Sequence, residues 1–447
     1  MDSGIDIENA SIRGHSKRHF DILEKETGHT LLKKGIWVYF LLLIFEGALR
    51  KWIFPEYAAP LLIVRDPVAI WLLYTAWKYN ELPFNNYVLG MGAITILSVL
   101  TAITIGHGNL VVALYGARIL LLHFPLIFLI GHVFDRDDVI QMVKALLVIA
   151  IPMFVLIALQ FYSPQGALVN RGVGGDVQGG GFSGSLGYFR PPGTFSFTTG
   201  NSQFFGFVGV IVIYFWLNPK QISGILLTGA TISLIAAIPL SISRTLFFQV
   251  CLSLLFAAVS IARKPKYLVR MLLAGIGLVI IVLLLSKASF FSKSIEAFTY
   301  RFNDASDTEG GLKNTLTNRI LAGFYEPFQY PNFPFFGLGI GMGTNVGAQL
   351  LVGHADGFLI SEGEWGRVIG EMGAVLGITA IVIRLSICVK LIRASYKKLV
   401  KNDLLPWMLL SVTLQAVAQG QWAQPTALGF SVMMGGLSIA SLRAGKN

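Results

Sequence analysis

Apolar residues fall in long runs along this chain, and shorter polar segments separate most of them. A helix that crosses the hydrocarbon layer of a bilayer needs about 20 mostly apolar residues. About twelve runs approach this length, which predicts an all-α polytopic membrane protein with about twelve transmembrane helices. The predicted spans are 35–49, 58–77, 86–105, 110–130, 138–162, 200–217, 220–240, 244–262, 267–285, 366–389, 404–418 and 426–442.

Two long connections between these spans fall on the same side of the membrane if the spans alternate in direction. The first is the glycine-rich loop 163–199, and the second is the long loop 286–365. Residues 1–34 are polar and basic, and no small-x-small cleavage site follows, so we expect a cytosolic tail ahead of one transmembrane domain, 35–447. Because function resides in loops more often than in spans, we expect the chemistry at the outer face.

Composition supports the membrane class, since 54% of the 447 residues are hydrophobic and 13% are charged. Soluble chains carry about a quarter charged residues. The net charge of +11 follows the loops of one side, mainly 13–34, 263–266 and 390–401. This bias predicts that both termini are cytoplasmic and that nucleic acid is not a partner. Arg50 and Lys51 lie on the opposite side and depart from the trend.

Three arginines near the outer face are candidates for binding a ligand. Arg190 opens the sequence Arg-Pro-Pro-Gly-Thr-Phe, Arg244 ends Ser-Ile-Ser-Arg between two spans, and Arg319 lies in the long loop. A guanidinium is always charged, and its planar fork suits phosphate oxygens. The alternative is an interfacial arginine that meets lipid headgroups.

A second cluster precedes and enters the predicted span 366–389. If a helix begins near Glu364, then Glu364, Arg367 and Glu371 share one face and can pair. This pairing could be an ion-pair ladder with a purely structural role. His354 or Glu362 could act as a general base, although a lone histidine is more often simply solvated.

Charges also fall within predicted spans, where they are costly and often functional. Arg65 and Asp66 are neighbours and could neutralise each other. Arg118, in span 110–130, could line the site from within the membrane.

Glycines recur in the segment 337–343, which does not fit G-x-G-x-x-G and has no βαβ context, so dinucleotide binding is rejected. We expect these glycines to let the backbone approach a ligand or a neighbouring helix closely. Four further glycines between 366 and 377 have the spacing of close helix packing.

Several outward arginines without metal-ligand spacing favour an anionic phosphate held without a metal. Cys251 and Cys388 lie inside predicted spans and suggest neither a disulfide nor a metal site. A lipid pyrophosphate fits this description. Cleavage between a sugar's anomeric carbon and pyrophosphate leaves charge on the departing group, which fixed cations stabilise. An acid/base residue could then take the proton from an attacking hydroxyl.

Four motifs and Arg319 together resemble the bacterial O-antigen ligase and polymerase superfamily, over residues 190–380. The motifs are Arg190-Pro-Pro-Gly-Thr-Phe, Ser241-Ile-Ser-Arg244-Thr, Pro334-Phe-Phe-Gly337-Leu-Gly339-Ile-Gly341 and Glu371-Met-Gly373-Ala-Val-Leu-Gly377. The resemblance implies a GT-C-like, metal-independent glycosyltransferase without a cofactor, at the periplasmic face of the inner membrane. Its partners would be membrane lipids, an undecaprenyl-pyrophosphate-linked oligosaccharide donor and a glycan or lipid acceptor.

The same resemblance suggests roles for individual residues. Arg190, Arg244 and Arg319 would hold the pyrophosphate, with Arg367 and Arg118 as further binding residues. Ligases of the family typically carry a histidine about nine or ten positions before the Glu-x-Gly element.

In this chain that stretch reads Ser361-Glu362-Gly-Glu364, and His354 lies further upstream. We therefore expect His354, Glu362 or Glu364 to be the catalytic acid/base residue, and a polymerase or exopolysaccharide-type member.

Two other classes remain open. A transporter or flippase of lipid-linked sugar or small solute would place ionisable residues at the bilayer midplane. A non-catalytic assembly subunit of an envelope complex would need no convergent arginines.

Overall fold

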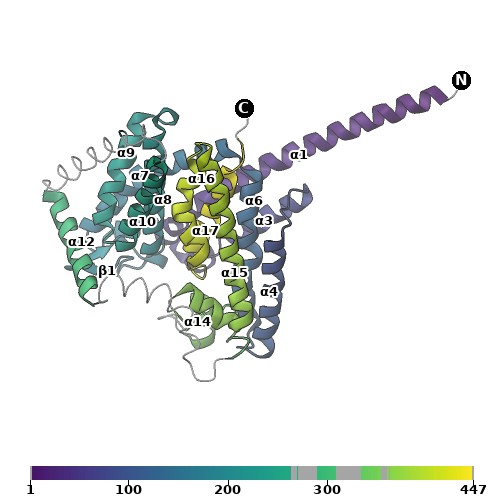
Figure 1. Cartoon of the computed structure of the whole chain (residues 1–447). Coiled ribbons are helices and arrows are strands. Elements are labelled where there is room, and N and C mark those ends of the chain that lie inside the picture. Colours follow the sequence, from purple (N-terminus) through teal and green to yellow (C-terminus); the bar gives the residue numbers. More distant parts are fainter. Residues whose placement is uncertain are drawn as a thin grey trace.

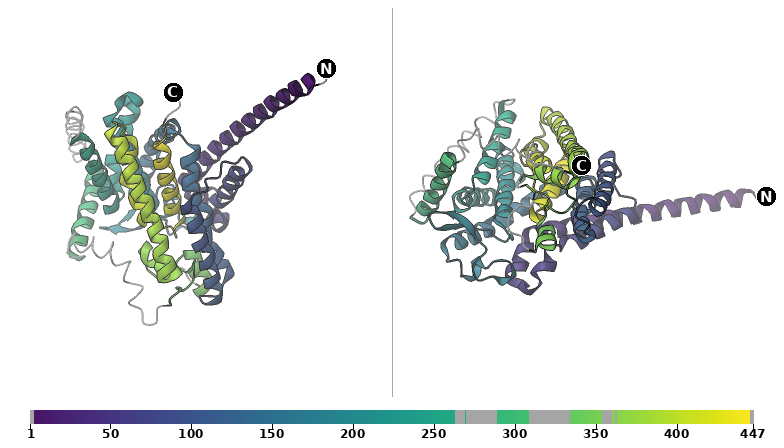
Figure 2. Two further views of the ribbon diagram at one scale, coloured as in Figure 1. Left: turned by 45° about the vertical axis from the view of Figure 1, so that its right-hand side comes forward. Right: turned by 90° about the horizontal axis from the view of Figure 1, so that it is seen from below.

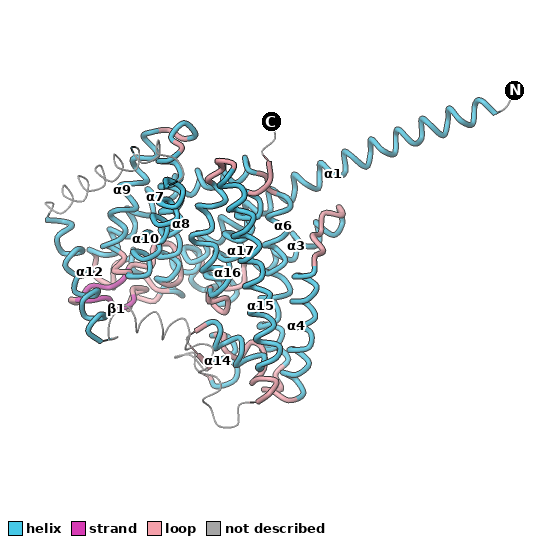
Figure 3. The backbone as a smooth tube through the Cα atoms, viewed as in Figure 1, coloured by secondary structure: helices cyan, strands magenta, loops and turns pink. Residues whose placement is uncertain are grey.

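The computed structural model of the chain describes residues 3–262, 269, 289–308, 334–353, 360–361 and 363–444. The structure is 78% helix and 2% strand. The expected helical class is therefore confirmed, with a small antiparallel sheet as an addition that the sequence did not predict (Figure 3).

The helices follow one another with short connections through most of the chain. Those of the first half are α1 (Ser3–Ala48), α2 (Ala58–Leu61), α3 (Arg65–Lys78), α4 (Asn86–Thr104), α5 (Leu110–Arg118), α6 (Phe124–Val133) and α7 (Arg136–Tyr162). Those of the second half are α8 (Thr198–Leu217), α9 (Gly224–Leu240), α10 (Arg244–Ala262), α12 (Ser289–Thr308), α14 (Asn345–Val352), α15 (Glu364–Val400), α16 (Leu405–Gln419) and α17 (Pro425–Ser441). Single helical turns join some of them: η1 (Leu49–Ile53), η2 (Pro55–Tyr57), η3 (Ile119–His123), η4 (Leu168–Asn170), η5 (Val173–Gly175) and η6 (Pro219–Gln221).

Apolar helices of membrane-spanning length indicate a membrane protein. Six candidates lie among the described residues: α4, α5 to α6 through η3, α7, α8, α10 and α15. The pair Pro55–Leu61 and Arg65–Lys78, bent by 42°, makes a seventh if it is one span. Helices α9, α16 and α17 are apolar but shorter, and the predicted span 267–285 lies outside the described residues.

Burial separates central helices from peripheral ones. The most apolar window of α8 is 83% buried, and α8 packs against α7, α9, α10, α16 and α17. The corresponding window of α4 is 28% buried, so most of its apolar side chains, such as Leu89, Ile96 and Leu100, face outward. An exposed apolar face of this kind suits contact with lipid.

Both termini lie at one end of the helical bundle (Figure 1). The sheet and α14 lie at the opposite end, which Figure 2 shows from a second side and from below. We call this opposite end the loop end. The polar connections 163–197 and 334–353 meet the bundle there.

Helix starts are encoded locally. Asp135 accepts from the backbone N–H groups of Asp137 and Asp138 at the start of α7, and the Asp138 side chain accepts from the Asp135 N–H in return. At the starts of α4 and α5, the side chains of Asn85 and Asn109 each accept from two backbone N–H groups. These caps satisfy donors that the first helical turn leaves without partners.

The loop 163–199 is folded. Its strands β1 (Phe182–Ser185) and β2 (Tyr188–Arg190) form an antiparallel hairpin. The two turn residues, Leu186 and Gly187, both have positive φ, which suits the right-handed twist of the flanking strands. The hairpin places Arg190 at the end of a strand.

Within the predicted loop 286–365, the described residues form the helices α12 and α14. α12 packs against α9 and β1 on the flank of the bundle (Figure 1). α14 is capped by Thr344 and ends at Gly353, whose φ of +82° is typical of a helix C-terminus. Residues 3–34 of the predicted tail are likewise helical, because α1 runs without a break from Ser3 to Ala48, within the predicted first span.

α15 is broken at Gly373, whose φ of +78° and ψ of 174° are not helical. Eight residues span about 12 Å of a straight helix. A Cβ on Gly377 would nevertheless lie 2.8 Å from the Cα of Ile369, so the chain turns back sharply. The carbonyls that the break frees accept from the glycine segment: Leu338 donates to Gly370 O at 2.8 Å, and Gly339 to Glu371 O at 2.9 Å.

Candidate functional site

Three arginines gather at the loop end from different elements. Arg190 ends β2, Arg244 begins α10, and Arg301 lies on α12. Burial, followed by the positive charges of Arg301 and Arg244, lowers the pKa of Arg190 below its ordinary value, to about 10. The charges of Arg301 and Arg244 therefore act on Arg190, and we call these three residues the arginine group.

The hairpin and α12 hold the arginine group together. Ser185 Oγ donates to the carbonyl of Ala297, one turn before Arg301. A Cβ on Gly184 would lie 2.7 Å from Ile242 Cδ1 and 3.4 Å from Arg190 Cγ. β1 therefore contacts both Arg190 and the turn that precedes Arg244. Ile242 is buried, and its φ of +47° is unusual for a β-branched residue. The turn ahead of Arg244 is therefore strained and fixed by packing.

Electrostatics favour an anion here. Among the residues that the structure describes, no carboxylate forms an ion pair with Arg190 or Arg301, and the buried Nε of Arg190 has no hydrogen-bond partner. Like charges brought together in a partly desolvated place repel one another, and a bound anion relieves this repulsion. Arginine forks match phosphate oxygens in geometry as well as in charge.

The segment after Arg190 is bound on several sides. Asn201 Nδ2 donates to Pro191 O at 3.0 Å. The Gly193 N–H donates to Gln160 Oε1 at 2.7 Å, and Gly193 O accepts from Lys51 Nζ at 2.6 Å. Gly193 has a φ of +63°, which favours glycine.

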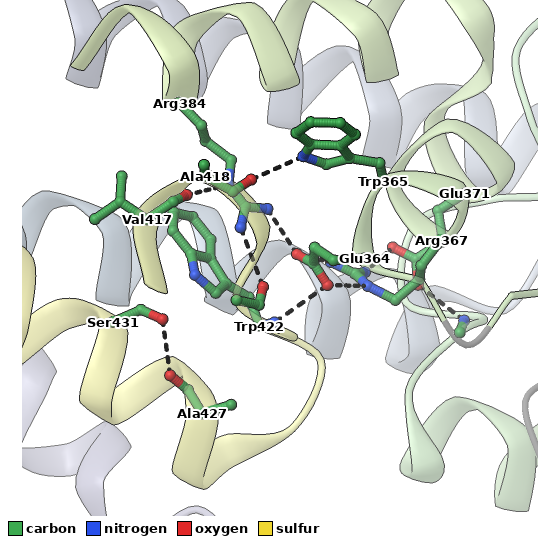
Figure 4. A network of polar contacts seen from close by, with 12 residues as sticks. Glu364, Trp365, Arg367, Glu371, Arg384, Val417, Ala418, Trp422, Ala427 and Ser431 are labelled. Atoms are coloured by element: carbon green, nitrogen blue, oxygen red, sulfur yellow. Dashed lines mark hydrogen bonds and ion pairs between the residues drawn. The ribbon is translucent and has the colours of Figure 1, made fainter. Parts of the chain in front are cut away.

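A buried ion-pair network lies at the start of α15 (Figure 4). Arg367 pairs with Glu364 at 2.9 Å and with Glu371 at 2.6 Å, as the helical spacing predicts. Arg384 adds a fourth charge, with its Nη1 2.7 Å from Glu364 Oε1. It also donates to Val417 O at 2.7 Å and stacks on the Trp422 ring at 3.8 Å. Two cations and two anions balance, which is how charges are tolerated when buried.

The sequence did not point to Arg384 as a partner of Glu364. Twenty residues separate the two, about 30 Å along a straight helix. The break at Gly373 brings them together. The available signal was an arginine inside an apolar run, which is rarely left without a partner.

The glycine segment 337–343 approaches neighbouring helices, which confirms one of the two expected uses. A Cβ on Gly341 would lie 2.1 Å from Val112 O, and one on Gly337 would lie 2.4 Å from Gly373 N. The Gly343 N–H donates to Glu371 Oε1 at 2.8 Å. The segment therefore contacts the ion-pair network on the side of the loop end.

Arg65 and Asp66 do not neutralise each other, so that expectation was wrong. Asp66 accepts from Arg118 at 2.7 Å and pairs with His123 at 2.9 Å, whereas Arg65 lies 3.7 Å from Glu46. Consecutive residues on a helix point in different directions, so neither can face the other. Arg118 is thus held in an ion pair apart from the arginine group.

The structure brings some of the predicted site residues together and separates others. Arg244 lies close enough to Arg190 to lower its pKa, while Glu364 and Arg367 belong to the buried network. The sequence missed Arg301 because its segment was read as loop. Apolar residues at 291, 295, 298 and 302 have helical spacing and could have revealed α12. Arg319, His354 and Glu362 lie outside the described residues.

Comparisons of the chain with protein-family models, with curated proteins and with solved structures found no match.

Proposed function

We propose that this protein is a membrane glycosyltransferase that polymerises or ligates an undecaprenyl-pyrophosphate-linked glycan at the periplasmic face. The observation that carries the proposal is the arginine group, in which Arg190 and Arg301 gather beside Arg244 without a described carboxylate partner. The motif resemblance to the O-antigen ligase and polymerase superfamily supports it. A GT-C-like arrangement of about twelve spans, with both termini in the cytoplasm, belongs to the same proposal.

The reaction transfers a glycan from the lipid diphosphate to an acceptor hydroxyl. The bond between the anomeric carbon and a diphosphate oxygen breaks, and the electron pair stays on the departing diphosphate. The guanidinium groups stabilise this charge as it develops, and they do so more strongly in a partly desolvated place. Holding donor and acceptor in line supplies a further large part of the rate.

The acceptor hydroxyl loses its proton to a general base. Glu364 is poorly suited, because Oε1 accepts from Arg367 and Arg384 and Oε2 accepts from Arg367 Nε and the Trp422 N–H. Both carboxylate oxygens already accept from two donors each, so neither is open to an acceptor hydroxyl. This leaves His354 and Glu362 as the proposed bases, and Glu364 as a residue that supports the site's scaffold.

A transporter or flippase is the second candidate. The ion-paired group of Asp66, Arg118 and His123 favours it, since ionisable residues within helices often mark transport pathways. Asp66 satisfies both partners at once, which equally fits a structural role.

The experiment uses purified protein in proteoliposomes with an undecaprenyl-pyrophosphate oligosaccharide from the native host. Released undecaprenyl pyrophosphate and glycan length are followed together. We expect release by the wild type and a loss of about 100-fold or more in Arg190→Gln, Arg244→Gln and Arg301→Gln. Arg393→Gln, an exposed arginine of α15, is the matched control and should retain full activity.

The products separate the alternatives. Longer glycans indicate a polymerase, and glycan moved to another acceptor indicates a ligase. A folded preparation that releases nothing, while it moves lipid or solute across the vesicle membrane, would refute the transferase and support the transporter.

A further inference from the structure

The loop-end terminus of α1, together with η1, contacts the segment that follows Arg190. Lys51 is 1% exposed, and its Nζ donates to Gly193 O at 2.6 Å and to Phe195 O at 2.8 Å. Burial lowers the pKa of Lys51 to about 7. A neutral amine still has two N–H donors for these two carbonyls, so the hydrogen bonds persist when the charge is lost.

Neighbouring residues reinforce the same contact. Arg50 Nη1 donates to Ser196 Oγ at 2.9 Å, and Thr194 Oγ1 donates to Ile44 O at 2.6 Å. A Cβ on Gly47 would lie 2.4 Å from Thr194 O, so the two backbones touch directly. Residues 44–51 and 193–196 are thus joined by four hydrogen bonds and one close backbone contact.

This contact bears on Arg190 through a stiff connection. Pro191 and Pro192 fix two φ angles between Arg190 and Gly193. Gly193 is held from the other side by Gln160, through its N–H at 2.7 Å. Because Gly193 is fixed and two prolines precede it, the backbone of Arg190 at the end of β2 has little conformational freedom.

We propose that residues 44–51 form a clamp that positions Arg190 for anion binding, with Lys51 as its central positioning residue. The inference rests on the proposed function, because it assigns the clamp a role at the same site. The clamp also explains why Arg50 and Lys51 lie on the side opposite to most of the other loop cations. Arg50 and Lys51 are buried in protein contacts and do not report orientation.

The test compares Lys51→Met, which keeps an apolar chain as far as Cε but removes the amino group and its donors, with Lys51→Gln, whose amide keeps two N–H donors. Lys220→Met removes an exposed lysine of η6 and is the matched control. Each protein is placed in nanodiscs, and two quantities are measured: amide hydrogen exchange over 188–197 and equilibrium binding of undecaprenyl diphosphate.

We expect Lys51→Met to exchange faster over 188–197 and to bind undecaprenyl diphosphate about tenfold more weakly, since two buried bonds are lost. Lys51→Gln should recover part of both. Should Lys51→Met fail to fold, Thr194→Val, which removes one bond of the same clamp, replaces it.

Unchanged affinity in a folded Lys51→Met or Thr194→Val protein, with the wild type binding well, would overturn the clamp alone. A general rise in exchange across the bundle, without a specific rise over 188–197, would also count against positioning. A wild type that does not bind undecaprenyl diphosphate would overturn the proposed function and the clamp with it.

Discussion

Buried charges divide into two kinds in this protein. In the network around Glu364, each described cation faces a carboxylate, and the charges balance. In the arginine group, Arg190 has a pKa lowered by burial and by two other cations. Balanced charges hold a structure together, whereas Arg190, which forms no ion pair with a described carboxylate, is suited to bind an anionic ligand.

The local part of these arrangements could be predicted from the sequence. Glu364, Arg367 and Glu371 pair because their spacing of three and four places them on one helical face. Arg384 and Arg301 could not be assigned in this way, since their neighbours come from distant parts of the chain. Long-range pairing depends on how helices break and pack, which periodicity does not encode.

Arg384→Met tests the buried network. Removal of one partner leaves Glu364 with less compensation, and we expect the free energy of unfolding to fall by about 3 kcal/mol or more. The measurement is unfolding in mixed detergent micelles. Arg393→Met, an exposed arginine of the same helix, should change the stability by less than about 0.5 kcal/mol.

The double variant Arg384→Met with Glu364→Gln should recover part of the loss, because it removes the uncompensated charge. Equal stability of Arg384→Met and wild type would show that the network contributes nothing to the fold.

At the scale of elements, apolar runs located the helices well, but their interruptions escaped prediction. The predicted span 366–389 lies within α15. The break at Gly373, which brings Glu364 and Arg384 together, was not predicted. A glycine in an apolar run is ambiguous, because close packing and a left-handed backbone both favour it. The partner segment that fills the break, 337–343, lies about 30 residues earlier and could not be inferred from spacing.

Gly373→Ala tests this break. The φ of +78° disfavours any side chain, and the new Cβ would lie 2.2 Å from Phe335 O. We expect a loss of about 3 kcal/mol or more in the free energy of unfolding, from backbone strain and overlap together.

Gly92→Ala is the matched control, since a Cβ there meets nothing within 4 Å in the middle of α4. It should be neutral or stabilising by up to about 1 kcal/mol. If both glycine variants behave alike, the break at Gly373 is not required by the fold.

At the scale of the whole molecule, the sequence predicted a helical membrane protein, and the apolar helices with outward apolar faces agree with it. It predicted loops at this end, where the described residues form a hairpin and the helices α12 and α14. Short strands rich in glycine and polar residues carry little periodic signal, and their folding depends on the bundle beneath them. Because two members of the arginine group lie in these connections, its arrangement could not be predicted from the sequence.

The central claim is that the arginine group binds the diphosphate of a lipid-linked glycan. The most direct measurement is equilibrium binding of undecaprenyl diphosphate and undecaprenyl monophosphate to the protein in nanodiscs. We compare the wild type with Arg190→Gln and Arg301→Gln, and use Arg393→Gln as the control. We expect the wild type to prefer the diphosphate, and each of the first two variants to lose about tenfold or more in affinity, because a charge-assisted contact is removed. Equal affinity of all four proteins, or no binding by the wild type, would contradict it.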